Sequence, residues 1–414
     1  MSGPGLELRQ PNKWIELIKL LIILTAVMAV RNSFGLFLTS IENQFGLTRG
    51  GTSAFFSVFS ILAAFFTVLG GWALDRFGTK IVFIVMGLIT AVSLVLTGQT
   101  TSSWQLFLTY SLLLAAGTGG GFSLTLAAIS RLFTKRRGLA LGIGLSGEGV
   151  GTLAVAPLAT FLISTFNWRI AYSVIGPLAG AIIFGFALLL KRTSQNSEEI
   201  IQAKSSAEPR AAGFSVAEAM KTATFWLLGL VYLTISFNYY LALNHLVPNA
   251  IDLGITASRA AIIVALIGGF TIPGRLIIGW ASDRMNRKML SICCTVVQVA
   301  AMIWLTSSHS LWMFCVFAVV FGFTFGGLSN LMATLIGDTF GMTNIGAMTG
   351  VLVVGFTIGA ALGPALGGLI YDASGSYFLA FVTGLGVACL AVLCMVFTRP
   401  ELKARLTKAA RTAT

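Results

Sequence analysis

The sequence predicts an all-α membrane protein of twelve transmembrane helices, arranged as two pseudo-symmetric six-helix bundles. The chain of 414 residues is 56% hydrophobic and only 10% charged, whereas soluble proteins carry about 25% charged residues. Apolar runs close to the ~20 residues that cross a bilayer recur along the whole chain. A segment at 71–80 recurs at 279–288, which indicates an internal duplication of the kind common in transporters.

The apolar runs define six spans in each half of the chain. The connections are short except for 191–221, which is polar and is expected to be a cytoplasmic linker. The predicted domains are therefore an N-terminal bundle at 1–190, this linker, and a C-terminal bundle with a basic tail at 222–414. The expected spans are 17–41, 52–74, 81–98, 104–130, 138–163, 169–190, 222–250, 258–281, 288–306, 311–337, 343–369 and 376–397.

The basic residues alternate with the apolar runs. Of the 27 Lys and Arg residues, 22 fall in loops or tails on one side of the expected spans, and only Arg49, Arg169 and Arg259 fall in loops on the other. This asymmetry predicts an inner-membrane protein with both termini in the cytoplasm. Nucleic-acid binding would require the charge on one folded face, so we expect no nucleic-acid partner. The five cysteines all lie in apolar runs, and we expect no metal site and no cofactor.

The internal repeat extends beyond one segment. The stretch GWALDRFGTK begins at Gly71 and GWASDRMNRK begins at Gly279, 208 positions later. The same offset places Gly46 on Gly254, and Gly151 on Gly359. An offset shared by separate segments indicates that the two halves arose by duplication.

The first repeated stretch matches the G-x-L-A-D-R-x-G-x-K loop of the major facilitator superfamily. A glycine at position 78 permits a tight bend, and Asp75 can meet a helix N-terminus or a basic partner. The resemblance implies the major facilitator fold and a role in conformational change, and it does not identify the substrate. The matching residues are Gly71, Asp75, Arg76, Gly78 and Lys80, with Asp283 and Arg284 in the second copy.

A narrower resemblance appears in four further segments. They are RLFTKRRGLALGI from Arg131, the triplet NWR at 167–169, NHLVP at 244–248, and the pair Gly274–Arg275. Together they resemble the monocarboxylate porter family, including its bacterial members and the related oxalate–formate exchangers. The resemblance implies alternating-access transport of a small monocarboxylate such as lactate or pyruvate, coupled to a proton. Anion exchange of the oxalate–formate type is the alternative, and we expect a functional monomer in the bilayer.

Three ionisable residues lie inside expected spans, where a charge costs about 2.5–3.5 kcal/mol on insertion scales. Arg275, Arg31 and Glu148 lie at depths of ~9, ~21 and ~15 Å from the inner side at 1.5 Å per residue. Arg275 is the leading substrate residue, because a guanidinium can hold a carboxylate through two hydrogen bonds. The resemblance implies the same role. The alternative for Arg275 is a structural ion pair with Glu148, or extension of its side chain toward the inner surface.

The chain departs from the family pattern at three places. Thr271 stands where many members carry an aspartate tied to proton coupling, and Asn32 stands where many carry a lysine, although Arg31 is adjacent. The span 343–369 contains no Lys or Arg, whereas an oxalate-type exchanger is expected to have a second cation there. These departures weaken the inference of proton coupling by analogy and also that of dicarboxylate exchange.

Glu148 is therefore the chain's own candidate proton carrier, because burial and a neighbouring arginine have opposite effects on a carboxyl group. A permanently paired structural carboxylate is the alternative. His245, at the outer end of its span, is the second candidate for proton coupling or substrate contact. The alternative for His245 is a satisfied interfacial histidine.

Further polar and aromatic residues are candidates for substrate binding. Tyr239 coincides with Arg31 in the repeat, so we expect the two positions to face each other. Phe325 and Tyr240 are suited to enclosing the apolar part of a lactate-sized ligand, although packing is the alternative role. The remaining candidates are Asn244, Thr271 and Asn330. No nucleophile–base pair or phosphate loop is recognisable, so we do not expect an enzyme. A sensor with this fold would be expected to carry a large folded soluble appendage, and neither the tails nor the linker is long enough to form one, so we do not expect a sensor.

Overall fold

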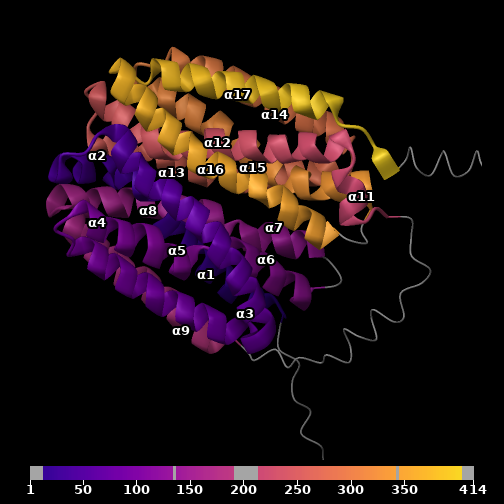
Figure 1. The fold of residues 1–414 in the computed structure, drawn as a ribbon, viewed down its shortest axis with the longest axis horizontal. Helices are drawn as coiled ribbons and strands as arrows, with labels where there is room; N and C mark the ends of the chain where they lie inside the picture. Colours follow the sequence, from indigo (N-terminus) through magenta and orange to yellow (C-terminus); the bar gives the residue numbers. More distant parts are fainter. Residues whose placement is uncertain (1–12, 134–136, 191–212, 342–344, 403–414) are drawn as a thin grey trace, which may run out of the picture.

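A computed structural model of the chain describes residues 13–133, 137–190, 213–341 and 345–402, and these residues are almost entirely helical. Helices from the first half of the chain, indigo to magenta, form one side of the molecule, and those from the second half, pink through orange to yellow, form the other (Figure 1). The expected tail after 402 and residues 191–212 of the expected linker lie outside the described residues. The last part of that linker contains a short helix, α11, which begins with a capping box between Ser215 and Glu218.

The helices follow one another with short connections. Those of the first half are α1 (Lys13–Arg31), α2 (Phe34–Phe45), α3 (Arg49–Gly98), α4 (Ser103–Leu106), the π-helical segment Phe107–Leu113, α5 (Leu114–Thr118), α6 (Gly121–Leu132), α7 (Arg137–Leu145), α8 (Gly147–Thr165) and α9 (Trp168–Leu189). Those of the second half are α11 (Val216–Met220), α12 (Ala223–Asp252), α13 (Ala257–Ser282), α14 (Arg287–Thr306), α15 (Leu311–Phe340), α16 (Ile345–Ser374) and α17 (Phe378–Phe397).

Ten helical stretches of the described residues are long and apolar enough to cross a membrane. The longest, α3, has 50 residues, or about 75 Å at 1.5 Å per residue, which is more than twice the ~30 Å of a bilayer core. Gly78 interrupts it with φ 82° and ψ 163°, a conformation that glycine adopts readily. The prediction of an all-α, multi-pass membrane protein is confirmed, and the exact number of twelve spans stays a prediction.

Three expected spans of the first half are interrupted. Asn32 and Ser33 separate α1 from α2, a turn at 119–120 separates α5 from α6, and Ser146 separates α7 from α8. Interrupted helices leave backbone N–H and carbonyl groups inside the bundle, and transporters use such groups to build binding sites. The apolar runs predict each of these three spans as one continuous helix, and the structure differs there.

Basic residues gather at one end of the bundle, which we call the basic end. There Lys19 donates to the carbonyl of Leu189 at 2.6 Å, and Lys288 donates to that of Thr398 at 2.7 Å. Arg131 pairs with Asp75, the basic partner expected for this loop. Each of these contacts joins segments of one half. We call the opposite end, which carries Arg49, Asp252 and Asp372, the far end.

The two halves meet along three principal pairs of helices, α3 with α16, α8 with α13 and α2 with α12. Glycines permit the closest approaches, because lipid-embedded helices pack through small residues. A Cβ added to Gly149 of α8 would lie 2.6 Å from the Gly268 carbonyl oxygen of α13. A Cβ added to Gly368 of α16 would lie 2.7 Å from the Arg49 carbonyl oxygen of α3.

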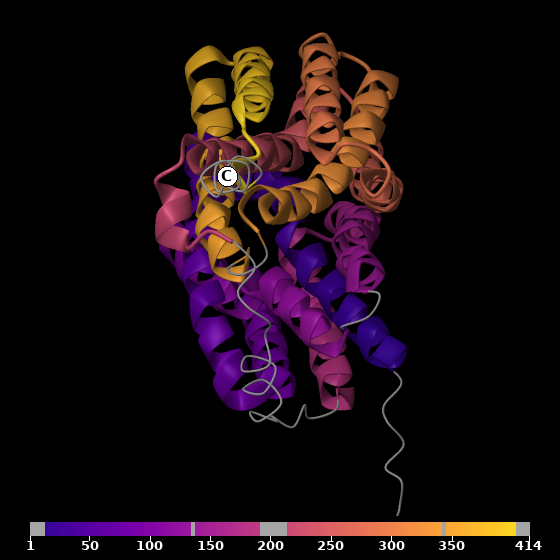
Figure 2. The same ribbon diagram turned by 90° about the vertical axis from the view of Figure 1, so that its right-hand side faces the viewer.

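Toward the basic end the same helices have more space. A Cβ added to Gly71 of α3, or to Gly346 or Gly350 of α16, would have no neighbour within 4 Å. The halves are therefore in close contact in the middle and at the far end, whereas these three glycines toward the basic end border open space. Figure 2 views the molecule from the side that carries α11, with the helices of the second half above those of the first.

Candidate substrate site between the two halves

Arg275 of α13 is only 2% exposed and makes three hydrogen bonds. Its Nη2 donates to Glu148 Oε2 at 2.7 Å and to Ser329 Oγ at 3.3 Å, and its Nη1 donates to the carbonyl oxygen of Leu145. Glu148 and Leu145 belong to the first half of the chain, whereas Arg275 and Ser329 belong to the second. The pairing of Arg275 with Glu148, which the sequence suggested as the alternative to substrate binding, therefore forms a charged link between the halves.

The interruption at Ser146 explains why these groups converge. Leu145 is the last residue of α7, so its carbonyl lacks an intrahelical partner. Glu148 lies in the first turn of α8, where the free N–H groups and the helix dipole favour a negative charge. One break in the helix thus presents both a carbonyl and a carboxylate to one guanidinium.

The guanidinium of Arg275 has one unused donor. Its Nε is buried and has no hydrogen-bond partner, although buried donors are paired in the great majority of cases. Glu148 contacts Nη2 alone, so it uses half of the edge formed by Nε and Nη2. A ligand carboxylate on this edge can accept from both atoms.

Arg31 is a second cation, at the last residue of α1. Its guanidinium carbon lies 5.6 Å from the ring centroid of Tyr240 and 5.7 Å from that of Phe59, within the range of cation–π attraction. No acidic side chain of the described segments forms an ion pair with Arg31, and its buried Nε lacks a hydrogen-bond partner. Arg31 therefore adds an uncompensated positive charge.

Aromatic residues that the sequence analysis did not identify surround Arg31. Tyr110, from the π-helical segment, is fully buried, and its hydroxyl has no hydrogen-bond partner. Its ring centroid lies 5.7 Å from that of Phe59, and Phe56 lies 5.3 Å from Tyr240. A tyrosine within an apolar span was the signal that could have indicated Tyr110, because a buried hydroxyl usually finds a partner.

Hydrogen bonds connect the break beside Arg31 with the helix that carries Glu148. Asn32 Nδ2 donates to Thr152 Oγ1 at 2.8 Å, and Thr152 Oγ1 donates to the Glu148 carbonyl at 2.9 Å. The two interrupted spans are thus joined directly.

The other predicted substrate residues surround this core. Tyr240, rather than Tyr239, lies against Arg31, and Tyr239 stacks on Phe325 with ring centroids 3.7 Å apart. Asn330 Nδ2 donates to the Arg275 carbonyl at 3.1 Å. The remaining two bond to their own helices, with Thr271 Oγ1 donating to the Gly268 carbonyl and Asn244 Nδ2 to the Tyr240 carbonyl.

His245 lies apart from the Arg275–Glu148 pair. Its fully buried ring contacts the Pro364 carbonyl oxygen at 2.8 Å, the Tyr377 hydroxyl at 3.1 Å and Ser53 Oγ at 3.5 Å. These residues belong to α16, the start of α17 and α3, near the far end. The structure therefore places His245 among residues of the far end rather than at the Arg275–Glu148 pair.

The residues of the repeated loop lie at the basic end, away from the two central arginines. Lys80 donates to the Leu188 carbonyl at 2.5 Å, and Arg76 lies over the ring of Trp72. In the second copy, Arg284 lies over the ring of Trp280, 4.0 Å from its centroid, and Asp283 pairs with Arg287 at 3.8 Å.

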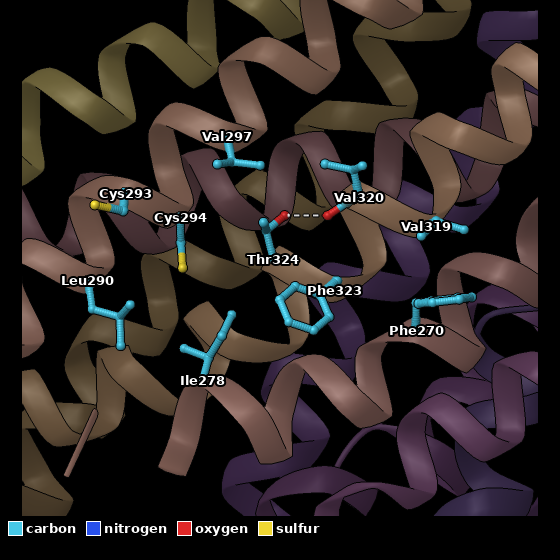
Figure 3. A pocket seen from close by; sticks show the side chains of 10 residues that line it. All are labelled: Phe270, Ile278, Leu290, Cys293, Cys294, Val297, Val319, Val320, Phe323 and Thr324. Atoms are coloured by element: carbon cyan, nitrogen blue, oxygen red, sulfur yellow. Dashed lines mark hydrogen bonds between the residues drawn. The ribbon is translucent and has the colours of Figure 1, made fainter. Parts of the chain in front are cut away.

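Elsewhere in the described residues there is an apolar cavity but no metal site. Across the described segments, no group of three or more His, Cys, Asp or Glu residues could hold a metal ion. A cavity of about 370 Å³ lies between α13, α14 and α15, with Phe270, Cys294 and Phe323 among its lining residues (Figure 3). None of the predicted substrate residues lines it, and its lining is almost wholly apolar.

The chain is similar to known transporters over most of its length. It is 25% identical over 389 residues to monocarboxylate transporter 12 of Xenopus laevis, covering 89% of this chain and 85% of the relative. It is 26% identical over 394 residues to monocarboxylate transporter 13 of Rattus norvegicus, covering 94% and 89%. It is 24% identical over 333 residues to the oxalate:formate antiporter of Oxalobacter formigenes, covering 80% and 78%.

A solved structure and a family model agree with these relatives. The fold matches that of a bacterial homologue of the human lysosomal transporter Spinster with a TM-score of 0.71 at 18% identity, covering 94% of this chain and 95% of the other. The Major Facilitator Superfamily model matches residues 20–248 and 228–413. This chain therefore belongs to the major facilitator superfamily, whose members are membrane transporters rather than enzymes.

Proposed function

We propose that this protein is a secondary active transporter that carries small monocarboxylates by alternating access, together with a proton. The observation that carries the proposal is the buried Arg275–Glu148 pair between the halves, in which Arg275 Nε is unused. The relatedness to transporters named for monocarboxylates and for oxalate and formate supports the same class of substrate.

Substrate binding at this pair follows from the donors of Arg275. A carboxylate that displaces Glu148 accepts from Nε and Nη2 together, so it satisfies one donor more than Glu148 does. The aromatic rings of Tyr239, Tyr240 and Phe325 offer apolar contact to a short carbon chain. Asn330 of α15 bonds to the Arg275 carbonyl and so ties α15 to α13 beside the arginine, whereas Thr271 bonds within α13.

Proton coupling follows from what happens to Glu148. Loss of one partner of a buried ion pair costs about 3–5 kcal/mol when the other charge remains unpaired. A Glu148 carboxylate displaced by substrate is in that position, and taking up a proton removes its charge. One proton therefore accompanies one monocarboxylate, and the charge around Arg275 is unchanged.

Anion exchange is the second candidate function, and the unpaired Arg31 favours it. Arg31 and Arg275 together with Glu148 carry one net positive charge. One monocarboxylate neutralises this charge without a proton. In such a carrier the empty, charged site resists reorientation, so that one anion enters only as another leaves. Because oxalate carries two negative charges, it leaves an excess negative charge in the exchange mechanism unless a proton binds.

The orientation and assembly belong to the same proposal. The protein lies in the inner membrane, and its basic end faces the cytoplasm because loops rich in Lys and Arg are retained on that side. Two homologous bundles, joined by the linker at 191–221, rock against each other around the site. The site is formed by one chain, so a monomer in the bilayer suffices.

The decisive experiment measures uptake of labelled carboxylates into proteoliposomes with and without an inward proton gradient. We expect lactate-sized monocarboxylates to accumulate when the gradient is imposed and to compete better than oxalate. If accumulation needs no pH gradient but occurs only in vesicles loaded with unlabelled anion, the protein is an anion exchanger. Transport of oxalate as good as or better than that of monocarboxylates contradicts the proposed substrate class.

A further inference from the structure

A second charged cluster, distinct from the substrate site, lies at the far end around Arg49. The side chain of Arg49 is nearly buried. Its Nε pairs with Glu42 of α2 at 2.8 Å, its Nη2 donates to Asp252 of α12 at 2.9 Å, and its Nη1 donates to the hydroxyl of Tyr377 at 2.9 Å. The ring centroid of Tyr371 lies 4.6 Å from the guanidinium carbon. Arg49 comes from the first half, and all these partners except Glu42 come from the second.

The backbone at Arg49 makes a further link between the halves. Asp372 of α16 accepts from the backbone N–H of Arg49 at 2.9 Å and from that of Gly50 at 2.8 Å. These N–H groups belong to the first turn of α3, where helix N–H groups lack intrahelical partners and favour a negative charge. A residue of the second half thus caps a helix of the first.

His245 completes this cluster, and its bonds define its neutral tautomer. Because a carbonyl oxygen can only accept, Nε2 carries the proton and donates to Pro364. Nδ1 of the neutral ring then accepts from the Tyr377 hydroxyl, whose oxygen accepts from Arg49. The chain of hydrogen bonds from Arg49 to Pro364 is complete with a neutral histidine. A second ring proton on Nδ1 would deprive the Tyr377 hydroxyl of its acceptor and place a positive charge near Arg49.

We infer that Arg49 is a latch that holds the far end of the transporter closed, and that it must leave Asp252, Asp372 and Tyr377 before the far end opens. The ion pairs that the described residues form at the basic end each join segments of one half, so none of these pairs holds the halves together there. The residue 208 positions after Arg49 is Ala257, so the duplicated crossing of α13 and α8 lacks this latch. Closure of the far end therefore depends on Arg49.

The test labels a cysteine beneath the latch. Ser53→Cys, in a variant with the five native cysteines replaced by serine, lies beside His245 and is buried while the latch is closed. A membrane-impermeant maleimide is added from the far end. We expect Arg49→Ala to accelerate labelling at least tenfold, a shift of about 1.4 kcal/mol in the conformational equilibrium, and Arg49→Lys and Asp252→Asn to have intermediate effects.

A reciprocal probe distinguishes opening from misfolding. The second probe is Gly142→Cys of α7, to which the maleimide is added from the basic end. A Cβ at this position has one neighbour within 4 Å, the Leu276 side chain at 4.0 Å. Opening of the far end should protect it, whereas misfolding leaves both cysteines accessible. Arg169→Ala is the matched control, because Arg169 bonds to Thr100 and stacks on Trp168 within one half, and it should leave both rates unchanged.

Two results overturn the inference. The first is unchanged labelling of the Ser53→Cys probe in both Arg49→Ala and Asp252→Asn, with both variants correctly inserted. The second is faster labelling with no protection of the probe at 142. Neither probe requires a substrate, so the latch and the proposed transport activity can fail independently.

Discussion

Arg275 of α13 and Glu148 of α8 form a 2.7 Å ion pair across the two halves of the molecule, and both side chains are buried. The pair lies beside a crossing of α8 and α13 at which Gly149 and Gly268 allow the backbones to touch. A change at this pair therefore affects both the electrostatics of the site and the contact between the halves.

Glu148→Gln should separate exchange from proton-driven accumulation. The amide keeps the shape of the carboxyl group but cannot titrate, so the variant should exchange labelled for unlabelled substrate and fail to concentrate it in a proton gradient. Counterflow and gradient-driven uptake in proteoliposomes measure the two activities. Glu16→Gln is the control, because Glu16 is also buried but pairs with Lys19 within α1. Unchanged accumulation in Glu148→Gln would show that another group carries the proton.

Arg275→Lys should raise the KM for transport on the order of tenfold or more. The ammonium retains the charge but loses the paired Nε and Nη2 donors, and hydrogen bonds to charged groups contribute about 1.5–3 kcal/mol. Arg275→Ala should abolish saturable transport in a protein that still inserts into the membrane. Arg287→Lys, a half-exposed arginine at the basic end, is the control. An unaltered KM in Arg275→Lys would exclude two-donor recognition of the carboxylate.

Tyr110→Phe tests whether the aromatic surroundings of Arg31 contact the substrate. The hydroxyl has no partner in the protein, so its removal should not lower the unfolding temperature, since a buried unsatisfied group is itself costly. A substrate contact predicts a rise in KM of about three- to tenfold, from the loss of a hydrogen bond of roughly 0.5–1.5 kcal/mol. Tyr172→Phe removes another buried, unpartnered hydroxyl, on a ring stacked on Phe37. Equal effects of the two substitutions would refute a specific role for Tyr110.

Gly149→Ala should slow transport by about tenfold or more through the contact of α8 with α13. The added Cβ would lie 2.3 Å from Thr271 Oγ1 and 2.6 Å from the Gly268 carbonyl oxygen, so the helices must move apart. Gly138→Ala is the control, because a Cβ there has no neighbour within 4 Å. Transport rates and the unfolding temperature in detergent measure the effect, and a fully active Gly149→Ala variant would contradict the need for this close crossing.

A reporter fused at position 200 or at the C-terminus should be cytoplasmic, and one inserted at 100–103 should be outside. The reason is the unequal distribution of Lys and Arg between the two sets of loops. Phosphatase and fluorescent-protein fusions give opposite signals on the two sides of the membrane. An external location of position 200 would contradict the expected division into two halves.

Hydropathy and charge are properties of the linear chain, so the sequence by itself determined the class of fold. The apolar runs predicted a helical membrane protein, and the 208-residue repeat predicted two related halves. It also singled out Arg275, Glu148 and Arg31, because an ionisable group within an apolar run requires a partner or a function. From the sequence, an ion pair between Arg275 and Glu148 was only one alternative to a substrate-binding role for Arg275.

The tertiary structure decided which groups meet. The interruptions at 32–33 and at Ser146 fall at short polar stretches within otherwise apolar runs, and the packing of the helices decides which groups meet there. One residue of register places Tyr240 rather than Tyr239 against Arg31. The cluster around Arg49 combines side chains that are up to 328 positions apart in the chain, and no local pattern in the sequence encodes such a distance. Only the packing of α3 against α16, and of α2 against α12, brings these charges together, because a buried guanidinium needs acceptors for its N–H donors and no single segment of the chain supplies them.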